Sequence, residues 1–294
     1  MDRDYGRAFE NARPTLMGLA YRMLGSRADA EDAVQDTFVK WASADQAQIE
    51  NEAAWLTATC TRRCLDMLRA AHRKRVDYVG AWLPEPIQTP IESDLQDKLD
   101  LSKSLTTAFL LVLERLTPKE RAAYILHDVF DVPYGQIAST LDIREEACRK
   151  LVSRAKASIG QAKVRHATPV ERQDQLLTAF RAAIAGGNTA QLTALLSEDV
   201  RLSTDGGGKV PAVLKTLHGK SEVLAFVSDR LQGYWAGFEW LEADINGTRG
   251  MIVKDQGETH ATVSFGYDDA GRVTDIYIVR NPDKLAQLSE MTIH

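Results

Sequence analysis

The sequence has few cysteines, and their number and surroundings argue against both a disulfide framework and a zinc site. The 294 residues include three cysteines, Cys60, Cys64 and Cys148. A sparse, odd-numbered set argues against a disulfide framework. Cys60 and Cys64 are close in sequence, but no nearby cluster of His or Cys completes a zinc site. We therefore expect structural cysteines, no metal and no cofactor.

Long apolar segments are also absent. No apolar run approaches the roughly 18 residues that span a membrane, and the first residues have no signal-peptide core. The composition, 44% hydrophobic and 26% charged, is typical of globular proteins. We expect a cytoplasmic protein of two or three domains with no membrane partner.

An overall excess of positive charge is missing too, yet the charge is unevenly distributed. The net charge is −5, but residues 62–75 contain six Arg or Lys against one acid, and residues 144–165 contain seven against two. Two basic segments can neutralise DNA phosphates locally, although such segments are often only solvated helix faces. The acidic stretch from Glu85 to Asp100 would repel DNA and could fold back on the two basic segments.

The first 75 residues have helical periodicity. We expect a helix that ends at Gly25, a second from Asp29 to Trp41 and a third from Glu52 to Lys74, with a polar loop from Ser43 to Asn51. The predicted apolar face of the second helix comprises Ala30, Ala33, Val34, Phe38 and Trp41. On the face roughly opposite lie Asp32, Gln35 and Asp36, which suit a basic partner helix or plain solvated surface.

The next segments predict a linker and a helix-turn-helix. Residues 76–104 contain Pro84, Pro86 and Pro90, which block regular helix. Thr117, Pro118 and Glu120 are a helix-start signature. In the helix-turn-helix that follows, the packing residues are Ile137, Ala138 and Leu141, then Cys148, Leu151 and Val152, on either side of a turn at Asp142–Ile143.

The second helix of this motif is basic and, by its spacing, exposed. Its exposed residues are Arg144, Glu145, Arg149, Lys150, Ser153, Arg154 and Lys156. The first four are our candidates for reading bases, because an arginine near the start of such a helix can bind guanine bidentately. The remaining three would reach phosphates.

From about residue 170 the pattern predicts an α+β domain. Helices are expected at about 171–185, 188–197 and 219–231. The expected strands are Val200–Ser203, Phe238–Ile245, Gly250–Lys254, Thr259–Tyr267 and Val273–Arg280.

Two segments carry a resemblance to a known family. Residues 30–41, AEDAVQDTFVKW, resemble the core-binding region of extracytoplasmic-function (ECF) RNA polymerase sigma factors, and residues 133–156 resemble the sigma region that reads the promoter −35 element. The resemblance implies that Asp32, Gln35 and Asp36 contact a coiled coil of the largest subunit of core RNA polymerase. It places Phe38 and Trp41 in the protein core.

The resemblance also makes the third helix the reader of the −10 element. Strand opening requires a pocket for an unstacked base and a basic track for the single strand. The loop Ser43–Asn51 is the candidate pocket, and the predicted DNA-binding residues are Asn51, Arg62, Arg69 and Arg73. Trp55 is expected in the core.

Three short motifs sharpen the resemblance to ECF sigma factors that carry a fused SnoaL-like domain, a cone of curved sheet closed by helices. They are Trp82-Leu83-Pro84-Glu85-Pro86, Asp205-Gly206-Gly207-Gly208-Lys209 and Asn281-Pro282-Asp283-Lys284-Leu285. The resemblance covers essentially the whole chain. It implies two all-α sigma domains, the second a helix-turn-helix, and a C-terminal α+β domain, with boundaries 1–79, 80–104 (linker), 105–168 and 169–294.

In such proteins the fused domain is implied to regulate in cis. We expect the glycine loop to rest against the linker, because Gly206–Gly208 permit close backbone approach. Lys209 could pair with Glu85, and Asp283 and Lys284 would lie on a terminal tail that tightens or releases the contact. Holding the linker would set the distance between the two DNA-reading domains.

Two other functions stay open. The chain could be a dedicated helix-turn-helix regulator that binds duplex DNA without polymerase, whereas the favoured interpretation has core RNA polymerase and promoter DNA at −10 and −35 as partners. Alternatively, residues 170–294 could form an enzyme or a small-molecule pocket, since related folds host isomerases with a buried Asp or His as general base. The available groups are Asp205, His218, His260 and Asp275, and no spacing places two together. We favour a non-catalytic initiation factor.

Overall fold

The computed structural model of the chain describes residues 2–45, 48–75, 78–89, 105–160 and 168–288. Its contacts divide the chain into two compact units. The helical unit comprises Met1–Val76 and Val112–Ala162, and the sheet unit comprises Asp77–Leu111 and Lys163–His294. In the described part of the chain, no helix is long and apolar enough to cross a membrane.

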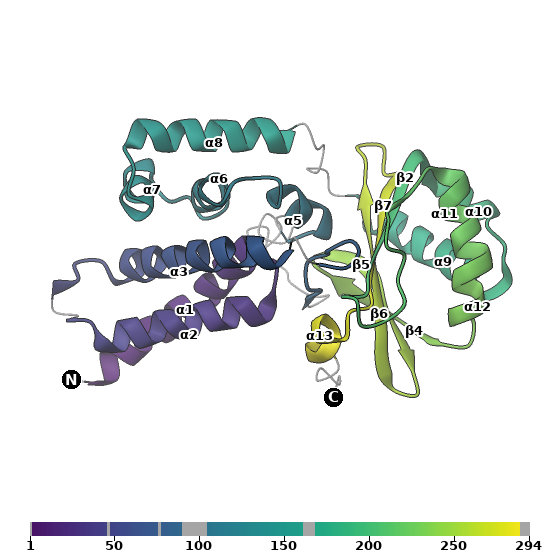
Figure 1. The fold of residues 1–294 in the computed structure, drawn as a ribbon, viewed down its shortest axis with the longest axis horizontal. Coiled ribbons are helices and arrows are strands. Elements are labelled where there is room, and N and C mark those ends of the chain that lie inside the picture. Colours follow the sequence, from purple (N-terminus) through teal and green to yellow (C-terminus); the bar gives the residue numbers. More distant parts are fainter. Residues whose placement is uncertain (1, 46–47, 76–77, 90–104, 161–167, 289–294) are drawn as a thin grey trace. The chain divides into compact units, whose positions relative to one another are not determined.

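The helical unit begins with three helices that pack on one another (Figure 1). They are α1 (Asp2–Leu24), α2 (Arg27–Ser43) and α3 (Glu52–Arg75), which confirms the three predicted helices. Gly25, with φ +68°, ends α1, and Ser26 begins α2 because its hydroxyl accepts the Asp29 amide hydrogen at 3.2 Å. Cys60 and Cys64 are buried in this helical core.

The second part of the helical unit is the predicted helix-turn-helix. Its elements are the end of α5 (Thr107–Leu113), α6 (Pro118–Tyr124), the π-helical turn η2 (Ile125–Val129), α7 (Tyr134–Leu141) and α8 (Glu145–Gly160). The capping box of Thr117 and Glu120 is present. Asp142 makes the turn in a left-handed conformation, φ 52° and ψ 60°, where glycine is the usual residue. Ile137, Ala138, Leu141, Cys148 and Val152 are buried as predicted, and Leu151 is half-buried.

The sheet unit is built on a seven-stranded sheet of order β1-β4-β5-β6-β7-β2-β3 within the described residues. The strands are β1 (Gln88–Thr89), β2 (Leu196–Asp205), β3 (Leu217–His218), β4 (Glu239–Ile245), β5 (Thr248–Asp255), β6 (Glu258–Tyr267) and β7 (Val273–Val279). Only the β2–β7 pair is parallel among those described. The linker supplies β1, which pairs with β4 at the sheet edge.

Helices cover the inner face of this sheet. They are α9 (Val170–Gly186), α10 (Ala190–Leu195), α11 (Lys220–Ala225), the π-helical turn η3 (Phe226–Leu231) and α12 (Gln232–Trp235). Strand residues of one parity, such as Val263 and Phe265, join Phe180 and Trp235 in a large apolar core. The predicted α+β class is confirmed, and the inside of the domain is filled by apolar side chains.

The outer face of the sheet is covered by the linker and the end of the chain. Along β7, Ile276 and Ile278 face the inner core, and the alternating residues Tyr277 and Val279 face outward. Tyr277 and Val279 pack with Leu83 of the linker and Leu285. Leu285 belongs to α13 (Pro282–Leu285), and Leu288 of the following turn η4 (Ala286–Leu288) joins the same cluster. Leu83, Ala108 and Leu111 thus pack in this second apolar cluster, which covers a sheet face that would otherwise be exposed.

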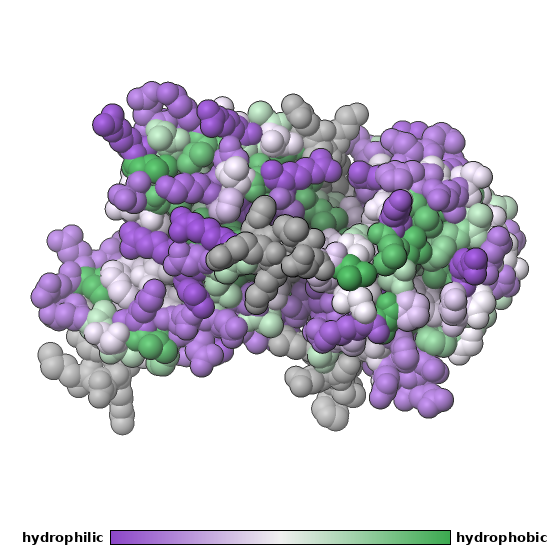
Figure 2. Space-filling model, in the orientation of Figure 1, coloured by the Kyte–Doolittle hydropathy of each residue, from purple (hydrophilic) through white to green (hydrophobic). Residues whose placement is uncertain are grey.

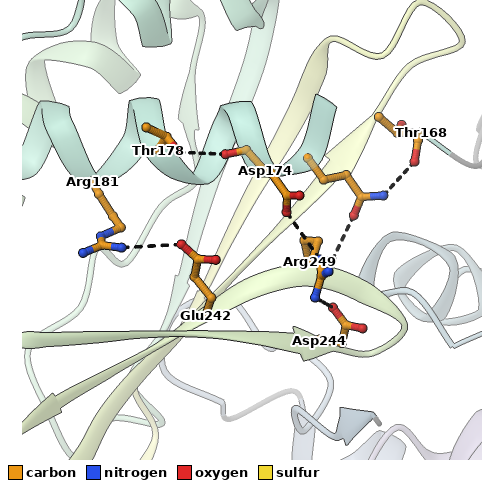
Figure 3. A network of polar contacts seen from close by, with 8 residues as sticks. Thr168, Asp174, Thr178, Arg181, Glu242, Asp244 and Arg249 are labelled. Atoms are coloured by element: carbon orange, nitrogen blue, oxygen red, sulfur yellow. Dashed lines mark hydrogen bonds and ion pairs between the residues drawn. The ribbon is translucent and has the colours of Figure 1, made fainter. Parts of the chain in front are cut away.

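A polar network ties α9 to the β4–β5 hairpin beside the apolar core (Figure 3). The Arg249 guanidinium lies 3.4 Å from Asp174 and 3.2 Å from Asp244. Gln173 accepts the Arg249 amide hydrogen at 2.9 Å and donates to the Thr168 carbonyl at 2.7 Å. These contacts fix the start of α9 on the sheet.

Candidate functional site

The acidic face of α2 is present as predicted. Asp32 and Gln35 are exposed, and Asp36 is half-buried because its carboxylate lies 2.5 Å from the Arg63 guanidinium of α3. The three side chains share one face of the helix, available to a partner surface.

The prediction that Phe38 lies in the core is wrong. Phe38 is 42% exposed, whereas Thr37 is fully buried and Trp41 is 1% exposed. The buried stripe follows positions 30, 33, 34, 37 and 41, so the helical period directs residue 37 inward and residue 38 to the edge. Thr37 is tolerated inside because its hydroxyl donates to the Ala33 carbonyl at 2.7 Å. Phe38 and the 60%-exposed Val39 therefore add an apolar margin to the acidic face.

The predicted −10 residues are distributed along α3. Asn51 begins the helix, where its side-chain oxygen accepts the Ala54 amide hydrogen at 3.0 Å. Arg69 is exposed and pairs with Asp66 at 3.1 Å. The side chain of Arg73 and residues 46–47 of the predicted pocket loop lie outside the described residues. Trp55 is only half-buried, against Trp41 with 5.5 Å between ring centroids.

The exposed side chain of Arg62 contacts the helix-turn-helix. Its guanidinium donates to the Thr140 and Ser139 carbonyls, at 3.1 and 3.3 Å, at the C-terminal end of α7. Carbonyls at this end of a helix are unpaired and favour a cation. Asn51 and Arg62 also line a groove of about 520 Å³ whose other wall includes Gln136 of α7.

A second arginine makes the reciprocal contact. Arg121 of α6 donates to the Met23 carbonyl at the end of α1 (2.7 Å) and pairs with Glu114 at 2.6 Å. Burial lowers the pKa of Arg121 to about 10. Each helical segment thus places an arginine on a helix C-terminus of the other, and the two predicted DNA-reading segments pack together in one unit. The sequence analysis treated residues 1–79 and 105–168 as two domains joined by a linker, whereas the contacts group Met1–Val76 and Val112–Ala162 in one compact unit.

The recognition helix α8 presents its predicted residues to solvent. Arg144, Glu145, Arg149, Lys150, Ser153, Arg154 and Lys156 are all exposed. Figure 2 shows that the visible surface over this helix is largely hydrophilic. Arg149 pairs with Glu145 at 2.6 Å, Lys150 with Glu146 at 2.9 Å, and Lys156 with Asp128 at 2.7 Å. The predicted residues are therefore brought together on one accessible surface.

The three short motifs converge on one buried carboxylate, that of Asp205. This side chain is fully buried at the end of β2. It accepts hydrogen bonds from the Tyr78 hydroxyl (2.6 Å), the Leu83 amide (2.9 Å) and the Gly207 amide (3.0 Å). The Lys284 ammonium completes the set at 2.7 Å. We call these residues, Tyr78, Leu83, Asp205, Gly207 and Lys284, the linker clamp.

Lys284 contacts the linker as well as Asp205. Its ammonium donates to the Leu83 carbonyl at 2.5 Å and lies 4.5 Å from the Trp82 ring centroid and 5.2 Å from that of Tyr78. Both backbone groups of Leu83 are therefore bound by one buried ion pair. Burial, and then the hydrogen bond to Asp205, raise the pKa of Tyr78 well above its usual range, so the hydroxyl stays a donor.

The glycine loop contacts the linker, as predicted, at Val79. A Cβ on Gly208 would lie 3.3 Å from the Val79 Cβ. Gly207 has φ +61°, and a Cβ there would overlap the Asn281 amide, which itself donates to the Tyr78 hydroxyl at 3.0 Å. Glycine is required at 207 by both conformation and space.

Two details of the predicted clamp are wrong. Lys209 pairs with Asp283, at 2.7 Å to each carboxylate oxygen, and not with Glu85. Glu85 is only 5% exposed. Asp283 and Lys284 are not on a loose tail: they belong to α13, and Lys284 is buried.

Sequence reasoning missed several residues that hold the linker. Tyr78 precedes the recognised motif and carried no signal of its own. Asn246 binds Ile87 twice, through its amide (2.8 Å) and its side-chain oxygen (2.7 Å). The dipeptide Asn246-Gly247, both with positive φ, is a hairpin signal that would have located this turn. Asn281 was predicted as part of the third motif, but its role as the cap of α13 ahead of Pro282, a readable helix-start signature, was not.

The groups considered for catalysis lie in different surroundings. Asp205 is occupied by the linker clamp, and Asp275 pairs with Arg201 at 2.7 Å. His218 and Asp275 share one row of the sheet with Arg201 between them, which the sequence did not predict. His260 packs edge-on against Phe238, 5.3 Å away. The buried residues of the inner core are apolar.

Comparisons with known proteins identify both helical segments. Residues 8–74 match the model of Sigma-70 region 2, and residues 106–159 match that of Sigma-70 region 4. The ECF RNA polymerase sigma factor SigJ of Mycobacterium tuberculosis is 37% identical over 231 residues, 78% of this chain and 74% of that protein. The probable ECF sigma factor SigI of the same species is 27% identical over 292 residues, 96% of this chain and 94% of that protein.

Solved structures extend the similarity to the sheet unit. The crystal structure of M. tuberculosis extracytoplasmic function sigma factor SigJ matches with a TM-score of 0.74 and 32% sequence identity, and the match covers 95% of this chain and 97% of that one.

Proposed function

The chain belongs to the ECF RNA polymerase sigma factors, which direct promoter-specific transcription initiation, and we propose that its SnoaL-like domain controls this activity in cis through the linker clamp. The observation that carries the proposal is the buried Asp205–Lys284 pair, which binds both backbone groups of Leu83. The linker between the two sigma regions is thereby part of the SnoaL-like fold.

The spacing of the two promoter elements explains why the linker clamp would affect transcription. The −10 and −35 elements lie roughly 25 base pairs apart, which at about 3.4 Å per base pair is on the order of 80 Å. In the helical unit, Arg62 of the predicted −10 helix contacts the carbonyls of α7 at 3.1 Å. The two regions must therefore separate before both elements are bound, and the length of linker left outside the clamp sets how far they separate.

The individual contacts follow the predicted surfaces. Asp32, Gln35 and Asp36 bind the coiled coil of the largest polymerase subunit, and the apolar margin of Phe38 and Val39 extends that surface. The −10 element is read by Asn51, Arg62, Arg69 and Arg73, and the −35 element by α8. Two observations support these assignments. The predicted residues of α8 and most of those on α2 are exposed, and Arg62 lines the groove between α3 and α7.

Promoter-spacing selectivity tests the proposal. In vitro transcription with core polymerase would compare promoters of optimal spacing with promoters lengthened or shortened between the two elements. Tyr78→Phe, which removes one hydrogen bond to Asp205, is expected to reduce the ratio of optimal to altered output by up to about fivefold, the equivalent of one hydrogen bond. Asp205→Asn is expected to reduce it further.

A matched control separates this effect from general damage to the domain. Arg181→Ala removes an exposed ion pair with Glu242 (3.4 Å) on the other side of the same domain and should leave the ratio unchanged. Spacing selectivity in Tyr78→Phe and Asp205→Asn equal to that of Arg181→Ala would refute control through the clamp. A wild-type chain that does not bind core polymerase would instead support the rival, a polymerase-independent DNA-binding regulator.

A further inference from the structure

Arg149 is held from two helices of the helix-turn-helix. Its guanidinium pairs with Glu145 one turn earlier in α8, at 2.6 Å. It also lies over the ring of Tyr134, the first residue of α7, 4.4 Å from the centroid. The side chain remains 58% exposed, so it is positioned without being covered.

The other cations of α8 are held differently among the described residues. Lys150 pairs with Glu146 at 2.9 Å, but those side chains are 68% and 81% exposed. Lys156 is tied back to Asp128 of η2 at 2.7 Å, and this hydrogen bond raises its pKa. Arg149 alone of these three lies over an aromatic ring in the described structure.

Tyr134 is itself fixed in place. Its ring lies 4.1 Å from that of His127, centroid to centroid, with 41° between the planes. His127 belongs to the π-helical turn η2, a local widening of the helix that occurs frequently at functional sites. The ring under Arg149 is therefore anchored from outside the recognition helix.

The Glu145 carboxylate also lies near the first turn of α7. A Cβ added to Gly135 would lie 3.5 Å from its second oxygen. The first oxygen accepts the hydrogen bond from Arg149 at 2.6 Å. This contact makes Glu145 a candidate for holding Arg149 in place.

We propose that Arg149 determines base selectivity at one position of the −35 element, with Tyr134 and Glu145 as its positioning residues. The inference rests on the proposed function and adds the residue that carries specificity. An arginine fork binds the O6 and N7 acceptors of guanine only when its plane is correctly presented. An aromatic ring beneath the guanidinium restricts its plane. Glu145 engages one terminal nitrogen, Nη2, which restricts its rotation within that plane.

The test measures base selectivity with the full chain bound to core polymerase. Open-complex formation is measured on promoters that carry each of the four bases at each −35 position. Arg149→Lys is expected to lower selectivity at one position by about tenfold, because an ammonium lacks the planar, pre-organised fork that stacks on Tyr134 and faces guanine. Tyr134→Leu and Glu145→Gln are expected to lower it at that same position, by about two- to fivefold for Tyr134→Leu.

Two variants serve as controls. Tyr134→Phe keeps the ring and should retain wild-type selectivity. Glu146→Gln breaks the neighbouring exposed pair with Lys150 and should leave selectivity unchanged at the position that Arg149 reads. Thermal unfolding of each variant reports whether the helix-turn-helix stays folded.

The outcomes are distinct. Selectivity unchanged in Tyr134→Leu, or lowered equally at every −35 position, would overturn the positioning role, since loss of structure would weaken all contacts alike. Full selectivity in Arg149→Lys would overturn the assignment of Arg149. A wild-type holoenzyme with no −35 preference would overturn the proposed function itself, and with it this inference.

Discussion

Asp205 shows how one residue links sequence motifs that are far apart in the chain. Its buried carboxylate is acceptable only because four donors satisfy it, and one of them carries the compensating charge. Removing one partner of a buried pair typically costs about 3–5 kcal/mol, whereas an exposed pair such as Lys209–Asp283 is worth at most about 1 kcal/mol. The stability of the clamp therefore resides in Asp205 and Lys284.

Gly207 provides a test of the clamp at a single backbone position. Gly207→Ala should destabilise the chain by roughly 2 kcal/mol or more and speed hydrogen exchange at residues 78–87, because the new Cβ overlaps Asn281 and φ is +61°. Gly257→Ala is the matched control: its φ is +86°, but no atom lies within 4 Å of a Cβ there. Urea unfolding and hydrogen-exchange mass spectrometry measure both effects.

The two glycines differ in what they contact, so the comparison separates strain from collision. Gly257→Ala should lose only the conformational part of the stability and leave exchange at residues 78–87 at the wild-type rate. Equal exchange in the two variants would show that the glycine loop does not support the linker.

At the scale of single helices and strands, the sequence was informative wherever a local rule decides the structure. The capping box at Thr117 and the turn at Asp142 were both predicted from short patterns and are present. The five predicted strands are present as β2, β4, β5, β6 and β7, whereas the two-residue strands β1 and β3 are too short to show alternation and were not predicted. The prediction failed at positions 37 and 38, where Thr37 is buried and Phe38 is exposed. A hydrophobicity pattern does not identify a threonine as a core residue, although its hydroxyl can donate to a carbonyl of its own helix.

Contacts between distant segments could not be predicted in the same way. The motifs identified the glycine loop and the linker, but charge alone suggested Lys209 with Glu85, where the fold pairs Lys209 with Asp283. Tyr78 and Arg121 act through partners more than 90 positions away, and no local pattern marks them. The packing of the two sigma regions on each other was missed for the same reason.

The face of α2 gives a prediction at the scale of one helix. Asp32→Lys should weaken binding to core polymerase by about tenfold or more, because it reverses an exposed charge on the proposed contact face without disturbing the helix core. Glu10→Lys makes the same charge change at an exposed site of α1 and should bind as wild type does. Fluorescence anisotropy of labelled chain with core polymerase measures the affinity, and an unchanged value for Asp32→Lys would exclude this face.

At the scale of the whole molecule, the two sigma regions contact each other through two arginines, each at a helix C-terminus of the other region. Part of the linker between them packs on the sheet of the SnoaL-like domain. The proposed function predicts that promoter binding breaks the two arginine contacts and that the linker clamp limits how far the regions separate.

Separation of the sigma regions is measured most directly by a distance between spin labels on the full chain. Glu10→Cys on α1 and Ser158→Cys on α8 are exposed sites, and the three natural cysteines are buried. In the complex with core polymerase and promoter DNA, pulsed electron paramagnetic resonance should give a longer mean distance than in the free chain, with a narrow distribution. Tyr78→Phe should broaden this distribution. The same distance in the free chain and in the promoter complex, or a distribution unaffected by Tyr78→Phe, would contradict the account.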